Sequence, residues 1–411
     1  MGGMNLESSA IIIFLVGLVM LASLCLKIGA KRFSVHPLIG YILIGALLRW
    51  LDTDMHFLSD RVLHPLKFLA ETGVIILLFR AGMESNIASL VRQLPRAAWI
   101  WFWNVVISGG LGFVSAYYLL DFAFVPSLFA ATALSATSIG VSVAIWESTG
   151  LRKTKEGQLL LDVAEMDDLS SVAFLALLLA VAPVLASGNG IFPSDLITET
   201  VSIFLLTFIL FAVGCSLFSW KAEPLLSHWV TKRQSDHEHL LMIFATGLMI
   251  AALAEILGLS LAIGAFFAGL AFSRDPETAR EKMCFQPLYE FFIPFFFVGI
   301  GLQINPDAFT FALWPGLILL IAAIAGKVIG AGGPVVAGAG LAGAAVVGFS
   351  MVPRAEIAMI VMEKGFELGG SVIPQNLFSA MVIVVAGTTL ITPVILPPLV
   401  RSWSQKNERN K

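Results

Sequence analysis

Long apolar runs alternate with short polar segments along the whole chain. About 20 residues, at about 1.5 Å per residue, carry a helix across the hydrocarbon core of a bilayer. Thirteen runs predict such helices, although the second and the ninth are short and would need tilted or re-entrant packing. The runs lie near residues 9–28, 36–51, 66–83, 97–119, 124–146, 157–184, 200–219, 239–257, 259–273, 287–303, 309–331, 337–363 and 376–400. We therefore expect an all-α polytopic membrane protein.

The polar segments between the runs predict the orientation. Most of the 25 Lys and Arg residues lie in one set of alternating loops and in the tail, residues 401–411. Such loops face the cytoplasm, which would place the N-terminus outside and the C-terminus inside. Trp99, Trp101 and Trp103 open the fourth span at this cytoplasmic face, as an interfacial aromatic belt does.

The order of the runs suggests an internal repeat. The seventh run separates two sets of six, and the first helix of each set would cross in the opposite sense. Two inverted six-helix repeats are typical of secondary transporters. This arrangement makes the fifth run of one repeat correspond to the twelfth run of the chain.

Composition narrows the function classes. Of the 411 residues, 58% are hydrophobic and 13% are charged, as expected of a membrane protein. Basic clusters occur only in loops and in the tail, which argues against nucleic-acid binding. Cys25, Cys215 and Cys284 lack CxxC spacing and predict free thiols, with neither a disulfide framework nor a zinc site. The run at 10–26 lacks a basic start and a cleavage site, so we expect a retained first span. We expect no cofactor.

The sixth run contains two adjacent acids, Asp167 and Asp168. Asp167 follows Lys155 by about 18 Å of helix, which places the pair near the bilayer midplane. Charges at that depth are expensive and usually line an ion or proton path. A structural ion pair is the alternative, but no cation lies nearby in the sequence. Glu165 and Asp162 precede the pair and could extend an acidic ladder from the cytoplasm to Asp168.

Two predicted helices are interrupted at corresponding places. The fifth run contains Thr137 and Ser138 followed by a glycine, and the twelfth contains Pro353, which removes a backbone donor and breaks a helix. Paired breaks at matching positions indicate a transport site. The hydroxyl groups of Thr137 and Ser138 could instead bond back to their own helix. Lys327 in the eleventh run could lie beside the acids or snorkel to the cytoplasmic surface.

These features together make the chain resemble the monovalent cation:proton antiporter-2 family, most closely its bacterial NapA-type sodium/proton antiporters. The motifs that carry the resemblance are Ala-Thr-Ser-Ile-Gly at 136–140, Asp167-Asp168, Lys327 and Met-Val-Pro-Arg-Ala-Glu at 351–356, with less specific matches at 77–84, 264–270 and 294–301. The resemblance implies an NhaA-like antiporter fold with broken crossing helices. It also implies an ion-carrying core, residues 97–184 and 309–400, and a panel that forms a homodimer, residues 1–96 and 200–303.

The resemblance also implies roles for single residues. Asp168 would be the main carboxylate for Na⁺, with Asp167 as its partner and Lys327 paired to Asp167. Thr137 and Ser138 would lie where the broken helices cross. Two further residues, Arg354 and Glu356, would be structural charges at the second break.

Several positions depart from the family pattern. Glu165 and Asp162 are additional acids, and Arg80 replaces an apolar residue, so we treat these three as possible modulators of the site. Arg80 could pair with Asp162 or Glu165. Ala355 replaces a usual glycine. The chain resembles a Kef-type membrane domain, and we expect it to lack the cytosolic nucleotide-binding regulatory domain, since it stops at Lys411.

The predicted activity is electrogenic exchange of a monovalent cation, Na⁺ first, for protons by alternating access in the bacterial inner membrane. The alternatives are K⁺/H⁺ exchange of the Kef type, or a cation channel or sensor on the same fold. An intramembrane protease is disfavoured because the Tyr-Asp and Gly-x-Gly-Asp contexts and HExxH are absent.

Overall fold

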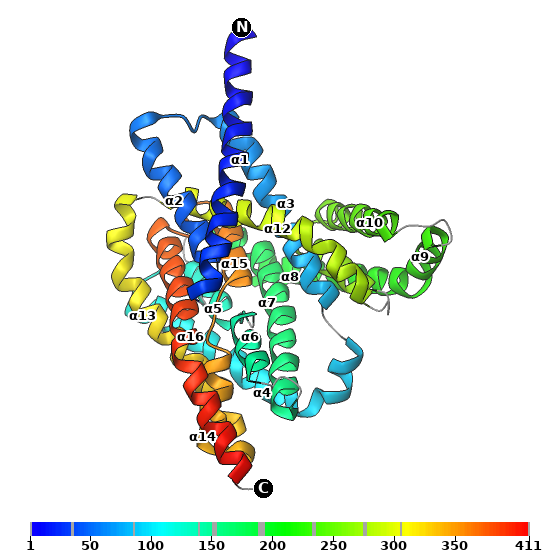
Figure 1. The fold of residues 1–411 in the computed structure, drawn as a ribbon, viewed down its shortest axis with the longest axis vertical. Helices are drawn as coiled ribbons and strands as arrows, with labels where there is room; N and C mark the ends of the chain where they lie inside the picture. Colours follow the sequence, from blue (N-terminus) through cyan, green and yellow to red (C-terminus); the bar gives the residue numbers. More distant parts are fainter. Residues whose placement is uncertain are drawn as a thin grey trace. The chain divides into compact units, whose positions relative to one another are not determined.

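The computed structural model describes residues 2–33, 37–84, 87–138, 140–149, 154–187, 194–231, 236–273, 278–304 and 306–409. These residues form sixteen α-helices, two π-helical turns and one 3-10 turn (Figure 1). In a bilayer, where water is absent, a helix satisfies the backbone hydrogen bonds within its own segment. This constraint explains why long apolar runs form helices throughout the chain.

The chain divides into two compact units. The first contains residues Met1–Leu26, Gly40–Ile87 and Leu179–Gln303, and the second contains Lys27–Ile39, Ala88–Leu178 and Ile304–Lys411. The roles of ion-carrying core and dimer-forming panel remain predictions.

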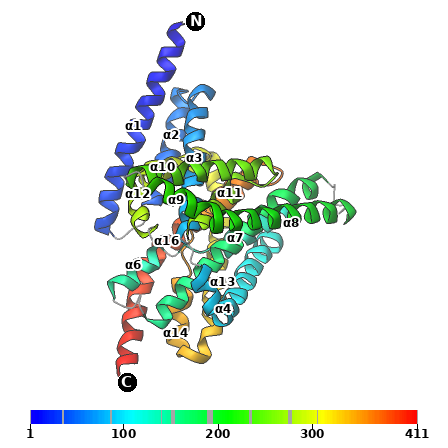
Figure 2. The ribbon, with the colours of Figure 1, turned by 90° about the vertical axis from the view of Figure 1, so that its right-hand side faces the viewer.

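The first unit is centred on α3 (Asp60–Glu84), which packs against α11 (Leu261–Phe272) and α12 (Thr278–Leu302) (Figure 2). Helix α10 (Asp236–Ile256) covers α11. Glycines allow the α3–α11 approach, since a Cβ on Gly269 would lie 2.8 Å from the carbonyl carbon of Phe79. The remaining elements of this unit are α1 (Gly2–Phe33), α2 (Leu38–Met55), α8 (Ser194–Leu217), η2 (Phe218–Ala222) and α9 (Glu223–Thr231).

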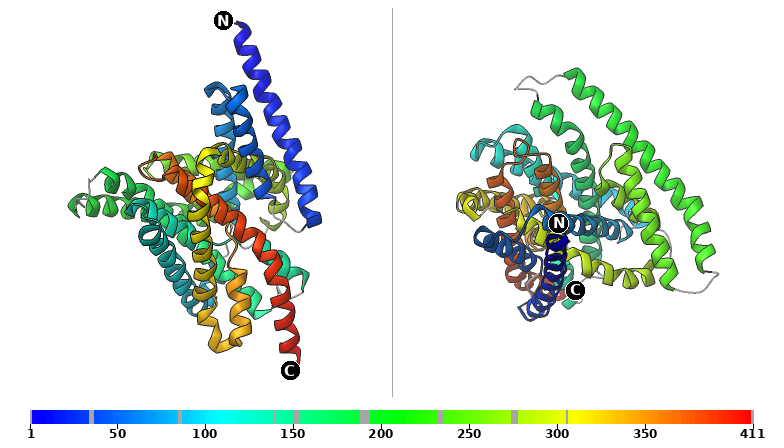
Figure 3. Two further views of the ribbon diagram at one scale, coloured as in Figure 1. Left: turned by 90° about the vertical axis from the view of Figure 1, so that its left-hand side faces the viewer. Right: turned by 90° about the horizontal axis from the view of Figure 1, so that it is seen from above.

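The second unit contains the predicted site residues except Arg80. Helices α13 and α16 lie side by side, and α14 packs against both of them (Figure 3). Helix α5 packs against α15. The elements are α4 (Ile87–Val114), η1 (Ser115–Leu119), α5 (Phe124–Ser135), α6 (Gly140–Ser148), α7 (Lys155–Ser187), α13 (Pro306–Gly330), η3 (Gly333–Val335), α14 (Val336–Ser350), α15 (Glu356–Glu367) and α16 (Gln375–Arg409).

Each of the thirteen predicted runs coincides with helix in the structure. The fifth run is divided into α5 and α6, and the twelfth into α14 and α15, as the interruptions predicted. Helix α9 is an additional short element that the sequence pattern did not predict. Within the described residues, nine helical stretches are long and apolar enough to cross a membrane, and α11 is a shorter apolar helix. The predicted all-α polytopic fold class is confirmed.

The glycine contact between α3 and α11 gives the first testable prediction. Gly269→Ala would push a methyl group into the backbone of Phe79 and cost about 1–3 kcal/mol of stability through overpacking. Gly17→Ala is the matched control, because a Cβ there meets nothing within 4 Å. The difference in stability is measured as the thermal unfolding midpoint of each purified variant. The folded fraction that remains after heating is detected by size-exclusion chromatography. Equal midpoints for the two variants would contradict the described packing.

Candidate functional site

The site is built where two broken helices meet. Helix α5 ends at Ser135, and Ala136 is already extended, with φ −60° and ψ 156°. The second interruption separates α14 from α15 and contains Pro353, which has no backbone N–H to continue a helix. The backbone N–H of Ser138 donates to the carbonyl oxygen of Pro353 at 2.9 Å. Each break therefore supplies a hydrogen-bond partner to the other.

Two buried cationic side chains donate hydrogen bonds to the carbonyl groups that the breaks expose. The guanidinium of Arg354 donates to the carbonyl oxygens of Leu134 at 2.7 Å, Val352 at 2.7 Å and Met351 at 3.0 Å. Lys327 Nζ donates to the carbonyl oxygen of Ser135 at 2.6 Å. A helix leaves its last carbonyls unsatisfied and carries partial negative charge at that end. The positive side chains of Arg354 and Lys327 compensate both effects.

The N-terminal end of α15 carries the opposite charge. Glu356 is the first residue of α15, and its Oε2 accepts a hydrogen bond from the hydroxyl of Ser138 at 2.9 Å. An acid in the first turn complements the positive end of the helix dipole. Arg354 and Glu356 thus lie at the second break, and both contact the first break.

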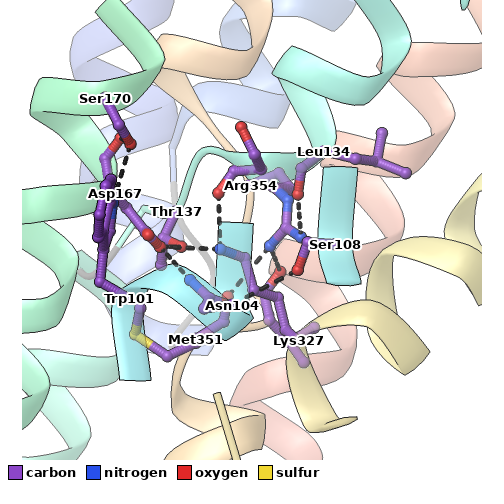
Figure 4. A network of polar contacts seen from close by, with 12 residues as sticks. Trp101, Asn104, Ser108, Leu134, Thr137, Asp167, Ser170, Lys327, Met351 and Arg354 are labelled. Carbon is purple, nitrogen blue, oxygen red and sulfur yellow. Dashed lines mark hydrogen bonds and ion pairs between the residues drawn. The ribbon is translucent and has the colours of Figure 1, made fainter. Parts of the chain in front are cut away.

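Asp167 of α7 lies at the centre of this network (Figure 4). Its Oδ2 accepts three hydrogen bonds, from Lys327 Nζ at 2.8 Å, Thr137 Oγ1 at 2.6 Å and Asn104 Nδ2 at 2.6 Å. Asp167, Lys327 and Asn104 are 0% exposed. Because charge-assisted hydrogen bonds are strong in a buried site, Oδ2 is firmly held. Its Oδ1 is buried without a hydrogen-bond partner in the described part of the chain.

Asp168 differs from its neighbour in exposure and in surroundings. It is only partly buried, and its Oδ1 has no hydrogen-bond partner among the described residues. The charges that act on it are those of Asp167, Glu356, Glu165 and Lys327. Three carboxylates and one ammonium group therefore surround this side chain. A carboxylate in such a field favours the binding of a hard cation or of protons.

Asp162 and Arg80 do not contact Asp167 in any hydrogen bond described above. Asp162 is 6% exposed, and its Oδ2 has no hydrogen-bond partner in the described residues. Arg80 belongs to the first unit, where it donates to Glu84 at 2.8 Å and Gln286 at 3.1 Å, and lies 4.2 Å from the ring centroid of Tyr289. Its pairing with Asp162 or Glu165 of the second unit remains a prediction.

The role of Asn104 and the bond between Trp101 Nε1 and Ser170 Oγ, at 3.1 Å, were not predicted from the sequence. The bonds from Arg354 to a carbonyl group of the other break were not predicted either. A signal for Asn104 was available, since an amide in the middle of an apolar span is unusual and usually has a partner there. For Trp101 and Arg354, only the structure shows which distant segment they contact.

A polytopic helical protein with two crossed, broken helices around buried acids falls in the class of secondary transporters. Comparisons with known proteins agree. The family described as "Sodium/hydrogen exchanger, transmembrane" matches residues 16–402. The solved structure of the sodium proton antiporter MjNhaP1 from Methanocaldococcus jannaschii at pH 8 superposes with a TM-score of 0.72. The superposition covers 97% of this chain and 99% of the solved chain, and the two sequences are 13% identical.

Two bacterial proteins are similar over nearly their full lengths. The Na⁺/H⁺ antiporter of Enterococcus hirae is 29% identical over 386 residues, which cover 93% of this chain and 97% of that protein. The Na⁺/H⁺-K⁺ antiporter GerN of Bacillus cereus is 28% identical over 377 residues, 91% of each. The chain belongs to the sodium/hydrogen exchanger family. It is an integral membrane antiporter of monovalent cations and protons and not an enzyme.

The hydrogen bonds of Arg354 predict that loss of this side chain destabilises the protein. Arg354→Met removes the donors for carbonyl groups on both breaks, and deleting one partner of a buried charged network costs about 3–5 kcal/mol. We expect a large drop in thermal midpoint. The control is Arg49→Met, because Arg49 pairs with Asp52 on the surface at 3.4 Å and such pairs contribute up to about 1 kcal/mol. An Arg354→Met midpoint equal to that of the control would contradict a structural role for this side chain.

Proposed function

We propose that the protein exchanges Na⁺ for protons, with Asp167 and Asp168 as the shared binding site. The proposal rests on a difference in hydrogen bonding between the carboxylate oxygens. Asp167 Oδ2 is held by three donors, whereas Asp167 Oδ1 and Asp168 Oδ1 lack hydrogen-bond partners in the described residues. Buried carboxylate oxygens without donors are suited to bind a cation or a proton.

Competition for the same oxygens couples the two transported species. A cation stabilises the ionised carboxylates, and protons remove the charge that the cation needs. The two acids are adjacent, so a cation or proton that binds to one changes the affinity of the other. Either Na⁺ or protons occupy the site in each half of the transport cycle, and the loaded core then moves against the panel to expose the site on the other side.

Lys327 explains why the proposed exchange moves net charge across the membrane. When the cation is absent, Lys327 neutralises Asp167 at 2.8 Å. A cation that binds to Asp167 weakens this pair, and Lys327 then releases a proton. More protons than cations move in each cycle, so the exchange is electrogenic.

The resemblance to NapA-type proteins and the Na⁺/H⁺ antiporters among the relatives support Na⁺ as the first substrate. GerN is named for K⁺ as well as Na⁺, and the 27% identical KhtU of Bacillus subtilis is named as a subunit of a K⁺/H⁺ antiporter. K⁺ is therefore the second candidate. We place the protein as a homodimer in the bacterial inner membrane, with the N-terminus outside and the C-terminus in the cytoplasm.

The site assignment is tested in proteoliposomes that contain a pH-sensitive dye. Asp168→Asn should reduce Na⁺-driven proton movement to the rate of empty liposomes, because the amide neither binds Na⁺ as strongly nor carries the proton. Glu71→Gln is the control, since Glu71 pairs with Lys67 at 3.8 Å near the surface, and it should transport at the wild-type rate. Exchange that survives Asp168→Asn would refute the assignment.

The electrogenic step has a separate test. An inside-negative diffusion potential should accelerate Na⁺ efflux through the wild-type protein, since net positive charge enters in each cycle. Lys327→Met should abolish this acceleration in whatever transport remains. Lys364→Met, which breaks an ion pair with Glu367 at 2.8 Å, should keep it. Wild-type transport that is indifferent to the potential would contradict the role given to Lys327.

A further inference from the structure

Asn104 is a fully buried amide in a span that is otherwise almost entirely apolar. It lies on α4, and its Nδ2 donates to Asp167 Oδ2 at 2.6 Å. A buried amide is expensive in lipid unless it is hydrogen-bonded, so this contact needs an explanation beyond chance packing.

Helix α4 also lies against α13, the helix that carries Lys327. A Cβ on Gly326 would lie 2.8 Å from the Cα of Ser108, and a Cβ on Gly330 would lie 2.9 Å from the Cα of Asn104. Two glycines four residues apart thus bring the backbone of α13 directly onto α4. Figure 4 shows the result, with the side chains of Asn104, Asp167 and Lys327 converging from three helices.

The three donors to Asp167 Oδ2 are not equivalent. Lys327 carries a charge that has to leave the carboxylate when a cation binds, whereas Asn104 and Thr137 are neutral and can stay in place. Neutral donors keep Oδ2 engaged and fix the rotation of the carboxylate while the ammonium group is displaced. The oxygen that remains for the transported ion is then Oδ1, which is buried and has no hydrogen-bond partner among the described residues.

We infer that Asn104 is a positioning residue for ion exchange, which orients Asp167 so that Oδ1 faces the transported cation while Lys327 leaves Oδ2. This inference rests on the proposed function, since it assumes that Asp167 binds the ion. Among the described residues, the charged groups that act on Asp167 or on its neighbour Asp168 are Glu165 on the same helix, Lys327 on α13, and Arg354 and Glu356 at the second break. None of these is removed by a substitution at Asn104.

A purely structural role is the alternative, in which Asn104 only ties α4 to α7. The chain offers a matched control for that role. Trp101 lies three residues earlier on α4, and its Nε1 donates to Ser170 Oγ on α7 at 3.1 Å. Ser170 in turn bonds the main-chain carbonyl of Asp167 at 3.0 Å and not its carboxylate. Trp101→Phe therefore removes an α4–α7 bond without touching the proposed site.

The experiment compares wild-type protein, Asn104→Leu and Trp101→Phe in proteoliposomes, with Na⁺ titrated at several pH values. We expect Asn104→Leu to raise the half-saturating Na⁺ concentration about tenfold, the factor that corresponds to about 1.4 kcal/mol. Its pH profile should differ from that of the wild type, because the contact that orients Asp167 toward the cation is lost. Trp101→Phe should remain within about twofold of wild type.

The inference is overturned if Asn104→Leu and Trp101→Phe give the same half-saturation and the same pH profile, or if both lose only maximal rate. Should Asn104→Leu fail to fold, as judged by its thermal midpoint, Asn104→Ser carries the test with the same expected direction. Failure of the proposed function looks different. In that case the wild-type protein itself shows no cation-driven proton movement, or Asp168→Asn retains it.

Discussion

The burial of two broken helices inside a membrane protein is the constraint on which this structure depends. A broken helix exposes carbonyl groups that lipid cannot satisfy, so the protein has to supply the donors. Arg354 and Lys327 do so for both breaks. Buried cations in turn require a buried anion, and Asp167 provides it at 2.8 Å from Lys327. The breaks, the cations and the acid therefore depend on one another.

This dependence links the proposed ion site to the backbone around it. Lys327 binds both the carboxylate of Asp167 and the end of α5 at Ser135. A change in the charge of Asp167 consequently alters the group that stabilises the first break. Ser138 connects the same break to Pro353 and Glu356. In the proposed mechanism, a bound ion would act on two helix ends together, and its occupancy could thereby control a movement of the proposed core.

The sequence predicted the elements well, because the bilayer imposes a length and a polarity on every span. It also located both breaks, since Pro353 cannot continue a helix and Thr137-Ser138 lies at the matching position. The sequence did not predict how deeply some polar side chains are buried or which residues they contact. Lys327 could have been a surface lysine, and the structure places it fully buried beside Asp167. Asn104, Trp101 and Arg354 find partners 63, 69 and 220 residues away in the chain, at Asp167, Ser170 and Leu134. Such pairings follow from the packing of whole helices, which local patterns do not specify.

In the proposed mechanism, one pair of carboxylates binds either the cation or protons. Calorimetric titration of the purified protein with Na⁺, repeated in two buffers that differ in ionisation enthalpy, measures the protons released by binding. We expect a clear difference between the two buffers, because Na⁺ displaces a proton from Asp168 and Lys327 releases another when Na⁺ takes its place beside Asp167. Na⁺ binding with the same heat in both buffers would mean that no proton leaves, and it would contradict the shared site.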